Sequence, residues 1–193
     1  YTIKSNALKN KFSPSVQGQF KRFRSEYPES PFLPELDAEF AEIMNFQNQS
    51  HNQLSVFENE EFANLTDLAN KYANKLLYLD IWASWCGPCK KEFENHSYEL
   101  NQFFQESGIQ RIYISIDDPS KAEVCAKIIN YYSLDGDHYL VNKKLLESIK
   151  SELNIVDGFP IPRYLIIDSS GQVLEKNAYR PSAEDTLIEQ LKQ

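Results

Sequence analysis

Two cysteines separated by two residues are the side chains of this sequence best suited to chemistry. Cys86 and Cys89 stand in the segment Trp82–Lys90, directly after the apolar run Leu76–Ile81. The apolar run predicts a buried strand, and Gly87-Pro88 followed by a helical pattern predicts a helix that begins at the first cysteine. Unpaired N–H groups and the helix dipole at such a terminus lower the pKa of a cysteine thiol, which supplies a reactive thiolate. The spacing therefore predicts thiol–disulfide exchange, in which Cys86 attacks and Cys89 resolves the mixed disulfide.

A zinc site is the alternative chemistry for such a pair, and it needs four ligands. The sequence has three cysteines and three histidines but no second Cys-x-x-Cys or Cys-x-x-His pair. A proline between the cysteines at a strand-to-helix turn also suits redox chemistry better, so we expect no metal and no cofactor. The remaining candidate ligands would be Cys125, His51, His96 and His138. Cys125 falls in a helical apolar pattern, which favours a core position, with a regulatory third thiol as the alternative.

The elements that must position these cysteines alternate between strand and helix. The periodicity predicts a buried strand over 76–82, a helix from Cys86 to about Glu106 that stops at Gly108, and further elements to the end of the chain. These are strands at 109–116, 139–141, 163–168 and 172–176 and helices at 120–132, 143–153 and from Pro181 onward. Such a rhythm predicts an α/β fold with a mixed central sheet flanked by helices.

The first fifty residues have a different, helical pattern. Ser13-Pro14 predicts the start of a helix that ends before Tyr27-Pro28, and Leu36, Phe40, Ile43 and Met44 recur at helical spacing after it. We place a boundary in the polar stretch 45–53, which could equally be a fraying helix end. The expected division is a helical N-terminal extension over 1–53 and a main domain over 54–193, which starts with a short extended piece at 54–57 and a helix at 65–73.

The charge distribution excludes a general nucleic-acid binder. The net charge is -8 and the pI is about 5.0, whereas such a protein needs a basic face. Residues 1–25 hold six lysines or arginines and no acidic residue, which favours a solvated helix face over an anionic partner or membrane surface. No apolar run is long enough to span a bilayer, and no secretory signal pattern opens the chain; a chain trimmed of its leader would look the same.

Two separated segments resemble one family. Trp82–Lys90 is similar to the thioredoxin active-site segment, and Gly158–Gly171 resembles the cis-proline strand of the TlpA/ResA-like thiol-disulfide oxidoreductases of the bacterial envelope. The resemblance covers about 54–193 well and 1–53 weakly. It implies a thioredoxin fold, a location in the periplasm or cell envelope, disulfide-containing protein substrates, and a membrane or periplasmic dithiol as electron donor. The leader would then be absent from this chain.

The resemblance also assigns substrate-binding residues. Pro162 would be a cis-proline facing Cys86, and Ile161 would offer backbone groups to the substrate chain. Arg163 would add positive potential near the thiolate or, equally, lie outward in solvent. Trp85 would shape an apolar rim, and the Gly87-Pro88 pair resembles that of thioredoxin, a reductant.

Two carboxylates would manage the proton of Cys89. Asp80 matches the buried aspartate of thioredoxin, and burial in an apolar strand should raise its pKa; an aspartate at a strand edge that caps a loop is the alternative. Glu92 matches a glutamate of ResA-like proteins and lies on the helical face of Cys89, although an exposed helix glutamate is the alternative. Glu94 stands where most relatives have a kinking proline, so we expect a straighter helix here.

We therefore predict a monomeric thiol-disulfide oxidoreductase that reduces protein disulfides through Cys86 and Cys89 and binds no nucleic acid. The alternative is an interaction module, in which residues 1–53 bind a partner and the thioredoxin-like domain is mainly a scaffold. The physiological substrate does not follow from these residues.

Overall fold

A computed structural model describes residues 15–48, 57, 60–72 and 75–192 of the 193-residue chain. They belong to two compact units, Tyr1–Gln53 and Leu54–Gln193.

The first unit is helical, as the sequence predicts. Helices α2 (Ser15–Glu26) and α3 (Leu33–Asn48) are joined by a turn. The rings of Phe20 and Phe40 stack with their centroids 3.9 Å apart, and Leu36 is buried beside them. Residues 13–14, where we expect the first helix to begin, lie outside the described part. The same holds for the side chains of residues 43 and 44, which belong to the apolar pattern of the second helix.

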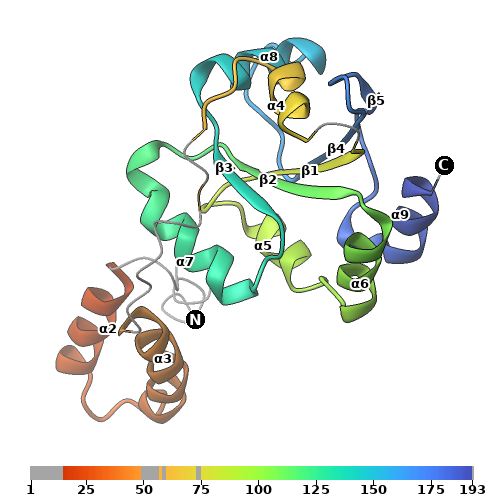
Figure 1. The fold of residues 1–193 in the computed structure, drawn as a ribbon. Coiled ribbons are helices and arrows are strands. Elements are labelled where there is room, and N and C mark those ends of the chain that lie inside the picture. Colours follow the sequence, from red (N-terminus) through yellow and green to blue (C-terminus); the bar gives the residue numbers. More distant parts are fainter. Residues whose placement is uncertain (1–14, 49–56, 58–59, 73–74, 193) are drawn as a thin grey trace. The chain divides into compact units, whose positions relative to one another are not determined.

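The second unit is built on one five-stranded sheet in the order β3-β2-β1-β4-β5 (Figure 1). The central strand β1 (Leu77–Trp82) pairs in parallel with β2 (Gln110–Ser115) and antiparallel with β4 (Arg163–Ile167). The outer strands are β3 (Asp137–Leu140) and β5 (Val173–Glu175). The expected α/β class with a mixed central sheet is confirmed.

Helices cover both faces of this sheet (Figure 1). Helices α4 (Leu65–Lys71) and α8 (Lys143–Glu152) pack on one face. The other face carries four helices and two 3₁₀ turns: α5 (Gly87–Phe93), α6 (Tyr98–Ser107), α7 (Ala122–Tyr132), α9 (Glu184–Leu191), η2 (Pro119–Lys121) and η3 (Pro181–Ala183).

Strand β1 explains why one face is purely apolar and the other is not. Successive side chains of a strand point to opposite faces. Leu77, Leu79 and Ile81 therefore join the apolar core under α4 and α8. Tyr78, Asp80 and Trp82 face the side of α5, where the Trp82 and Phe93 rings meet edge to face at 5.2 Å. All six residues of β1 are buried, so Asp80 lies in the interior of the domain.

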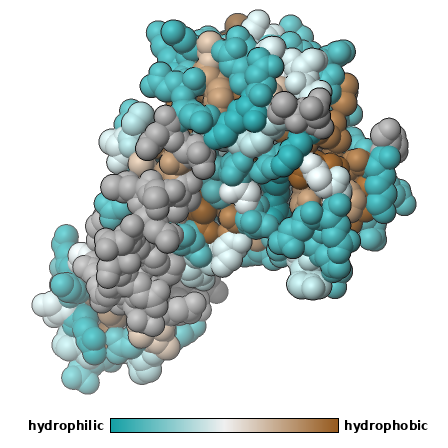
Figure 2. Space-filling view, in the orientation of Figure 1, coloured by the Kyte–Doolittle hydropathy of each residue, from teal (hydrophilic) through white to brown (hydrophobic). Residues whose placement is uncertain are grey.

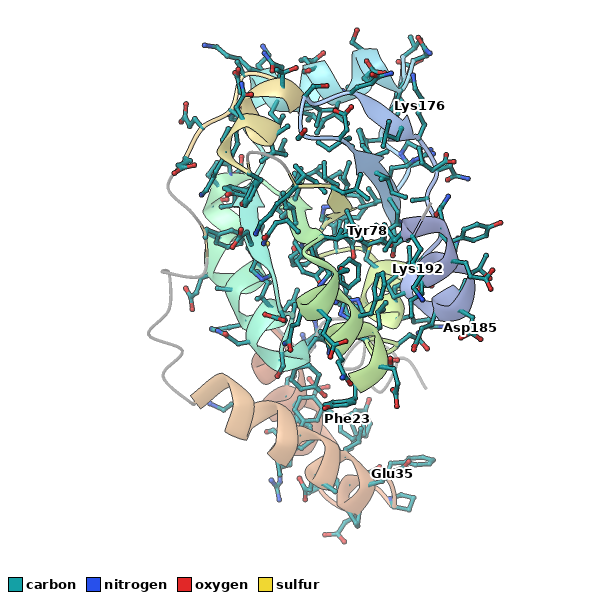
Figure 3. All side chains as sticks on the ribbon, turned by 45° about the vertical axis from the view of Figure 1, so that its right-hand side comes forward. Phe23, Glu35, Tyr78, Lys176, Asp185 and Lys192 are labelled. Carbon is teal, nitrogen blue, oxygen red and sulfur yellow. A yellow bond between two sulfur atoms is a disulfide. The ribbon has the colours of Figure 1, made fainter. Side chains whose placement is uncertain are left out.

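Tyr78 shows how this second face is tied to the C-terminal segment. It points from β1 into the interior, as labelled in Figure 3, and stacks on Tyr164 of β4. Its hydroxyl donates a hydrogen bond of 2.8 Å to the carbonyl oxygen of Tyr179, just before η3. The segment that leads to α9 is thus fixed to the central strand.

The prediction of one helix from Cys86 to about Glu106 is wrong, because the chain forms two helices there. Helix α5 ends at Phe93 and α6 begins at Tyr98. Between them the Asn95 amide donates to the carbonyl oxygen of Lys91, and Ser97 Oγ accepts from the N–H of Leu100 at 2.9 Å. Short polar side chains that bond to the backbone in this way compete with helix continuation and begin new helices. The chain therefore breaks at the position where we expected a straighter helix.

The other expected elements of the second unit are present, with ends that differ by a few residues. The extended piece predicted at 54–57 is described only at Phe57, which forms an isolated bridge with His138. Within the described ranges, no helix combines the length and apolar composition that crossing a bilayer requires. Hydrophilic residues cover most of the described surface on the side seen in Figure 2.

Candidate active site

Cys86 is the N-cap residue of α5. It follows β1 after a three-residue turn, and its extended backbone leads into the helix through Gly87 and Pro88 at the first two positions. A proline is favourable there because its missing N–H would have no partner in the helix. The Cys86 Sγ accepts a hydrogen bond of 3.1 Å from the N–H of Cys89. A thiolate at this position is stabilised by the backbone N–H groups of the helix terminus.

Cys86 and Cys89 form a disulfide, with their Cα atoms 5.3 Å apart. The structure is therefore of the oxidised protein. Cys86 keeps 3% of its surface exposed, whereas Cys89 is fully buried. Both cysteines are buried in the oxidised form, so the order of attack and resolution stays a prediction.

The Ile161–Pro162 segment lies at the same edge of the sheet. Its peptide bond is cis. Arg163, the next residue, pairs with Ile81 in the antiparallel register of β4 and β1, so Pro162 adjoins the end of β1 from which the chain turns to Cys86. The strand register thus brings residues distant in sequence to the end of β1 that precedes Cys86.

The four other predicted contact residues differ in their surroundings. Trp85 is exposed, and so are Gly87 and Pro88, so they form the surface around Cys86. Arg163 is half-buried, and its guanidinium donates to the carbonyl oxygen of Lys176 at 3.4 Å and to Asn177 Oδ1 at 3.3 Å. Arg163 is therefore directed to the segment after β5 rather than outward into solvent.

Asp80 has the environment of a carboxyl that titrates abnormally. It is 1% exposed on the central strand, and among the described residues neither of its oxygens has a hydrogen-bond partner. Burial raises the pKa of Asp80 well above its usual range; the charge of Arg111 opposes this shift and that of Glu92 adds to it. The alternative of an edge aspartate that caps a loop is wrong.

Glu92 is buried, so the alternative of an exposed helix glutamate is also wrong. Its carboxylate accepts hydrogen bonds from the N–H of Ser182 at 3.0 Å and from Ser182 Oγ at 3.1 Å. The Arg180 guanidinium lies 3.5 Å from Oε1. Glu92 therefore joins α5 to η3, and both of its oxygens are engaged in that contact.

The two described histidines are neutral at pH 7; His138 is buried and His96 is partly buried. Burial lowers the pKa of His96 to about 3 and that of His138 to about 4. In the part of the chain that the structure describes, no three His, Cys, Asp or Glu side chains are arranged to hold a metal ion. The third histidine, at position 51, lies outside that part.

Cys125 is fully buried on α7, which confirms the expected core position. Its Sγ donates to Asp117 Oδ2 at 3.3 Å, and burial raises the pKa of its thiol to about 12. A thiol with this pKa carries almost no thiolate at neutral pH, so it is a poor nucleophile.

Asp117 is a site residue that sequence reasoning missed. It lies two residues after the end of β2 and is buried. Its carboxylate accepts hydrogen bonds from both the N–H and the hydroxyl of Ser84, two residues before Cys86. The available signal was the alternation Ile114-Ser115-Ile116-Asp117, which puts two polar side chains on one side of an apolar strand and its end.

A mixed sheet with a Cys-x-x-Cys pair at the N-terminus of the helix after its central strand is the arrangement of the thioredoxin fold. The family model Redoxin matches residues 41–190. The chain therefore belongs to the Redoxin family.

Individual relatives agree with the resemblance seen in the sequence. The chain is 27% identical over 113 residues to the thiol-disulfide oxidoreductase ResA of Bacillus subtilis (strain 168), which covers 58% of this chain and 55% of that protein. It is 28% identical over 122 residues to ResA of Bacillus cereus (strain ZK / E33L); that match covers 58% of this chain and 63% of that protein. The chain thus spans less than two thirds of the length of these relatives. Among solved structures, a thiol:disulfide interchange protein from Bacteroides sp. is 21% identical with a TM-score of 0.49, over 64% of this chain and 78% of that one.

Proposed function

We propose that this chain is a thiol-disulfide oxidoreductase that reduces disulfides of bacterial envelope proteins through Cys86 and Cys89. The observation that carries the proposal is the Cys86–Cys89 disulfide at the N-terminus of α5, where Cys86 is the N-cap residue of the helix. The names of the ResA relatives support the reaction class.

The reaction begins with the reduced protein. The Cys86 thiolate attacks one sulfur of a substrate disulfide, so the substrate S–S bond breaks and a mixed disulfide forms. The first substrate thiolate leaves and takes a proton from solvent. The N–H of Cys89, which bonds to Cys86 Sγ, stabilises the attacking thiolate.

The second step releases the substrate. The Cys89 thiol gives its proton to the Asp80 carboxylate, and its sulfur attacks Cys86 Sγ, so the mixed disulfide breaks and the second substrate thiolate leaves. A carboxyl whose pKa burial has raised is closer to the pKa of a thiol, which makes it a better proton acceptor than an exposed aspartate. The substrate has gained two electrons from the Cys86/Cys89 dithiol. A dithiol donor in the membrane or periplasm then reduces the Cys86–Cys89 disulfide with two further electrons.

The substrate chain is bound at the surface next to Cys86. In this proposal Trp85, Gly87 and Pro88 form one side, and the backbone of Ile161 beside Pro162 forms the other. Glu92 and Arg163 form hydrogen bonds with other residues, so Asp80 is the group that accepts the proton of Cys89. The protein works as a monomer and needs no cofactor.

Reduction of insulin disulfides in the presence of a dithiol tests the activity. The wild-type protein should accelerate insulin precipitation, and Cys86→Ser should be no faster than the reductant alone. Cys125→Ser is the matched control, because it removes the buried third thiol and should keep full activity. Wild-type protein that performs like Cys86→Ser would overturn the proposal.

The role of Asp80 is tested by separating the two steps. Asp80→Asn should slow the resolution of the mixed disulfide more than its formation, because only resolution moves the proton of Cys89. Stopped-flow measurement of both steps decides the point. Equal slowing of both would assign Asp80 a structural role.

Residues 1–53 support a second candidate, an interaction module on a thioredoxin-like scaffold. The turn between α2 and α3 exposes the rings of Tyr27 and Phe32, which are side chains that often contact partners. Deletion of residues 1–53 separates the two candidates. Loss of partner capture with full insulin reduction would assign recognition to this extension.

A further inference from the structure

The carboxylate of Asp117 accepts two hydrogen bonds from Ser84, in the turn that leads to Cys86. Its Oδ2 accepts a hydrogen bond of 2.6 Å from the N–H of Ser84, and its Oδ1 accepts one of 2.6 Å from Ser84 Oγ. The two residues are 33 positions apart in sequence. A charged acceptor that binds two donors of one residue fixes both its distance and its orientation.

Asp117 is itself held firmly by the sheet and by α7. Its Oδ2 also accepts from Ser115 Oγ at 2.8 Å and from Cys125 Sγ at 3.3 Å. The N–H of Asp117 donates back to Ser115 Oγ at 3.2 Å. A buried carboxylate is costly unless hydrogen bonds replace its water, and four donors do so here. The carboxylate is therefore a fixed point rather than a mobile surface group.

The turn is held from the helix side as well. Lys90 of α5 donates from its Nζ to the carbonyl oxygen of Ser84 at 3.0 Å, so all three polar groups of Ser84 are bound. The N–H of Cys86 donates to the carbonyl oxygen of Ala83 at 3.0 Å, which closes the turn. Residues 83–86, the nucleophile turn, are thus clamped between the end of β2 and the first turns of α5.

We propose that Asp117, acting through Ser84, is a positioning residue that holds the Cys86 sulfur at the N-terminus of α5. This inference rests on the proposed function, in which the Cys86 thiolate attacks. Asp117 takes part in no chemical step. Its effect is to keep the thiolate where the N–H of Cys89 and the helix dipole stabilise it.

Two roles of Asp117 make opposite predictions. If the carboxylate positions the turn, its loss lets Cys86 move away from the helix terminus, the thiolate becomes scarcer at pH 7, and alkylation slows. If it acts only through its negative charge, its loss favours the thiolate and alkylation speeds up. Ser84→Ala removes one hydrogen bond of the clamp and leaves the charge in place, so it separates these roles.

The test is the rate of Cys86 alkylation by iodoacetamide in the reduced 193-residue chain at pH 7, followed on the peptide that carries Cys86. Asp117→Asn and Ser84→Ala should each slow alkylation, by about three- to tenfold for the loss of cap-like hydrogen bonds. Both should also shift the equilibrium with glutathione toward the protein disulfide. A role in stability alone would lower the melting temperature and leave both readouts unchanged.

Asp168→Asn is the matched control. The Asp168 carboxylate also accepts from the N–H and hydroxyl of a serine, Ser170, but in the exposed turn between β4 and β5. This variant should alkylate at the wild-type rate. Were Asp117→Asn not to fold, Ser84→Ala would decide alone.

Faster alkylation of Asp117→Asn with unchanged Ser84→Ala would overturn the positioning role in favour of a charge effect. Wild-type rates in both variants would overturn it as well. Insulin reduction by the wild-type protein is scored separately. Its absence would count against the proposed function, whereas the alkylation rates would still decide the role of Asp117.

Discussion

The buried His138 makes the free energy of unfolding depend on pH, and the size of this effect follows from its pKa. It lies on β3, buried, with its ring stacked on that of Tyr113 at a centroid distance of 4.8 Å. Its Nε2 lies 3.1 Å from the carbonyl oxygen of Leu134. Burial lowers the pKa of His138 from 6.5 to about 4, because the charged imidazolium would lose its water.

The neighbouring charges do not reverse this shift. The carbonyl oxygen of Leu134 and the carboxylates of Asp137 and Asp135 favour the imidazolium, whereas Arg111 opposes it. The balance leaves His138 neutral in the folded protein down to about pH 4. In the unfolded chain the same ring binds a proton below about pH 6.5.

The sign and size of the effect follow from these two pKa values. Between them the unfolded state binds more protons than the folded state, so the free energy of unfolding falls as the pH falls. From pH 7 to pH 4 this single residue should remove about 3 kcal/mol, since one pKa unit corresponds to about 1.4 kcal/mol. That is a large part of the stability of an ordinary domain.

His138→Gln is the perturbation that isolates this contribution. The glutamine amide can still donate to the carbonyl oxygen of Leu134 but cannot take up a proton in this range. Urea unfolding of both proteins at pH 7 and pH 4 measures the difference between them, in which the contributions of other titrating groups cancel. The advantage of wild type over His138→Gln should shrink by about 3 kcal/mol on acidification. A difference that is the same at both pH values would refute this reasoning.

Two further predictions concern the buried carboxylates of Asp80 and Glu92. The pKa of Asp80 is higher in the folded state than in the unfolded chain, so the free energy of unfolding falls as the pH rises above about 3.9. Asp80→Asn should therefore be more stable than wild type at pH 8, by about 1.4 kcal/mol per unit of that pKa shift, and nearly as stable as wild type at pH 3. Urea unfolding at both pH values checks this, and a gain that does not depend on pH would contradict it. Glu92→Gln should cost about 1–3 kcal/mol because the Ser182 N–H and hydroxyl lose the charged acceptor that the buried Glu92 provides. Thermal unfolding measures that cost, and unchanged stability with slow resolution of the mixed disulfide would assign Glu92 to the proton instead.

The sequence could predict the centre of the site because its signals are local. The apolar run before Cys86 gave strand β1 to within one residue, and the Gly87-Pro88 pair located the start of α5. The buried carboxyl of Asp80 followed from its place within that run. In each case the residues that determine the structure lie within about one turn or one strand of one another.

The break between α5 and α6 was missed for a physical reason. Phe93, Leu100 and Phe104 keep a helical spacing across it, so the apolar pattern alone continues through the turn. The local signals were Asn95 and Ser97, whose side chains bond to the backbone. Hydrophobic periodicity reports which face is buried and does not report where a helix ends.

The buried polar contacts could not be found in the same way. Glu92 is satisfied by Ser182, which is 90 residues away, and Asp117 by Ser84, which is 33 residues away. Neither spacing carries a pattern that one sequence can reveal. Only the folded arrangement distinguishes a buried, bonded glutamate from an exposed one.

The most direct test of the central claim is the mass of the species that Cys89→Ser forms with a disulfide substrate. Without its resolving thiol, the reduced variant should accumulate a mixed disulfide with insulin, and the linked peptide should contain Cys86. Cys86→Ser treated in the same way should accumulate none. A mixed disulfide through Cys125, or trapping by Cys86→Ser but not by Cys89→Ser, would contradict the account.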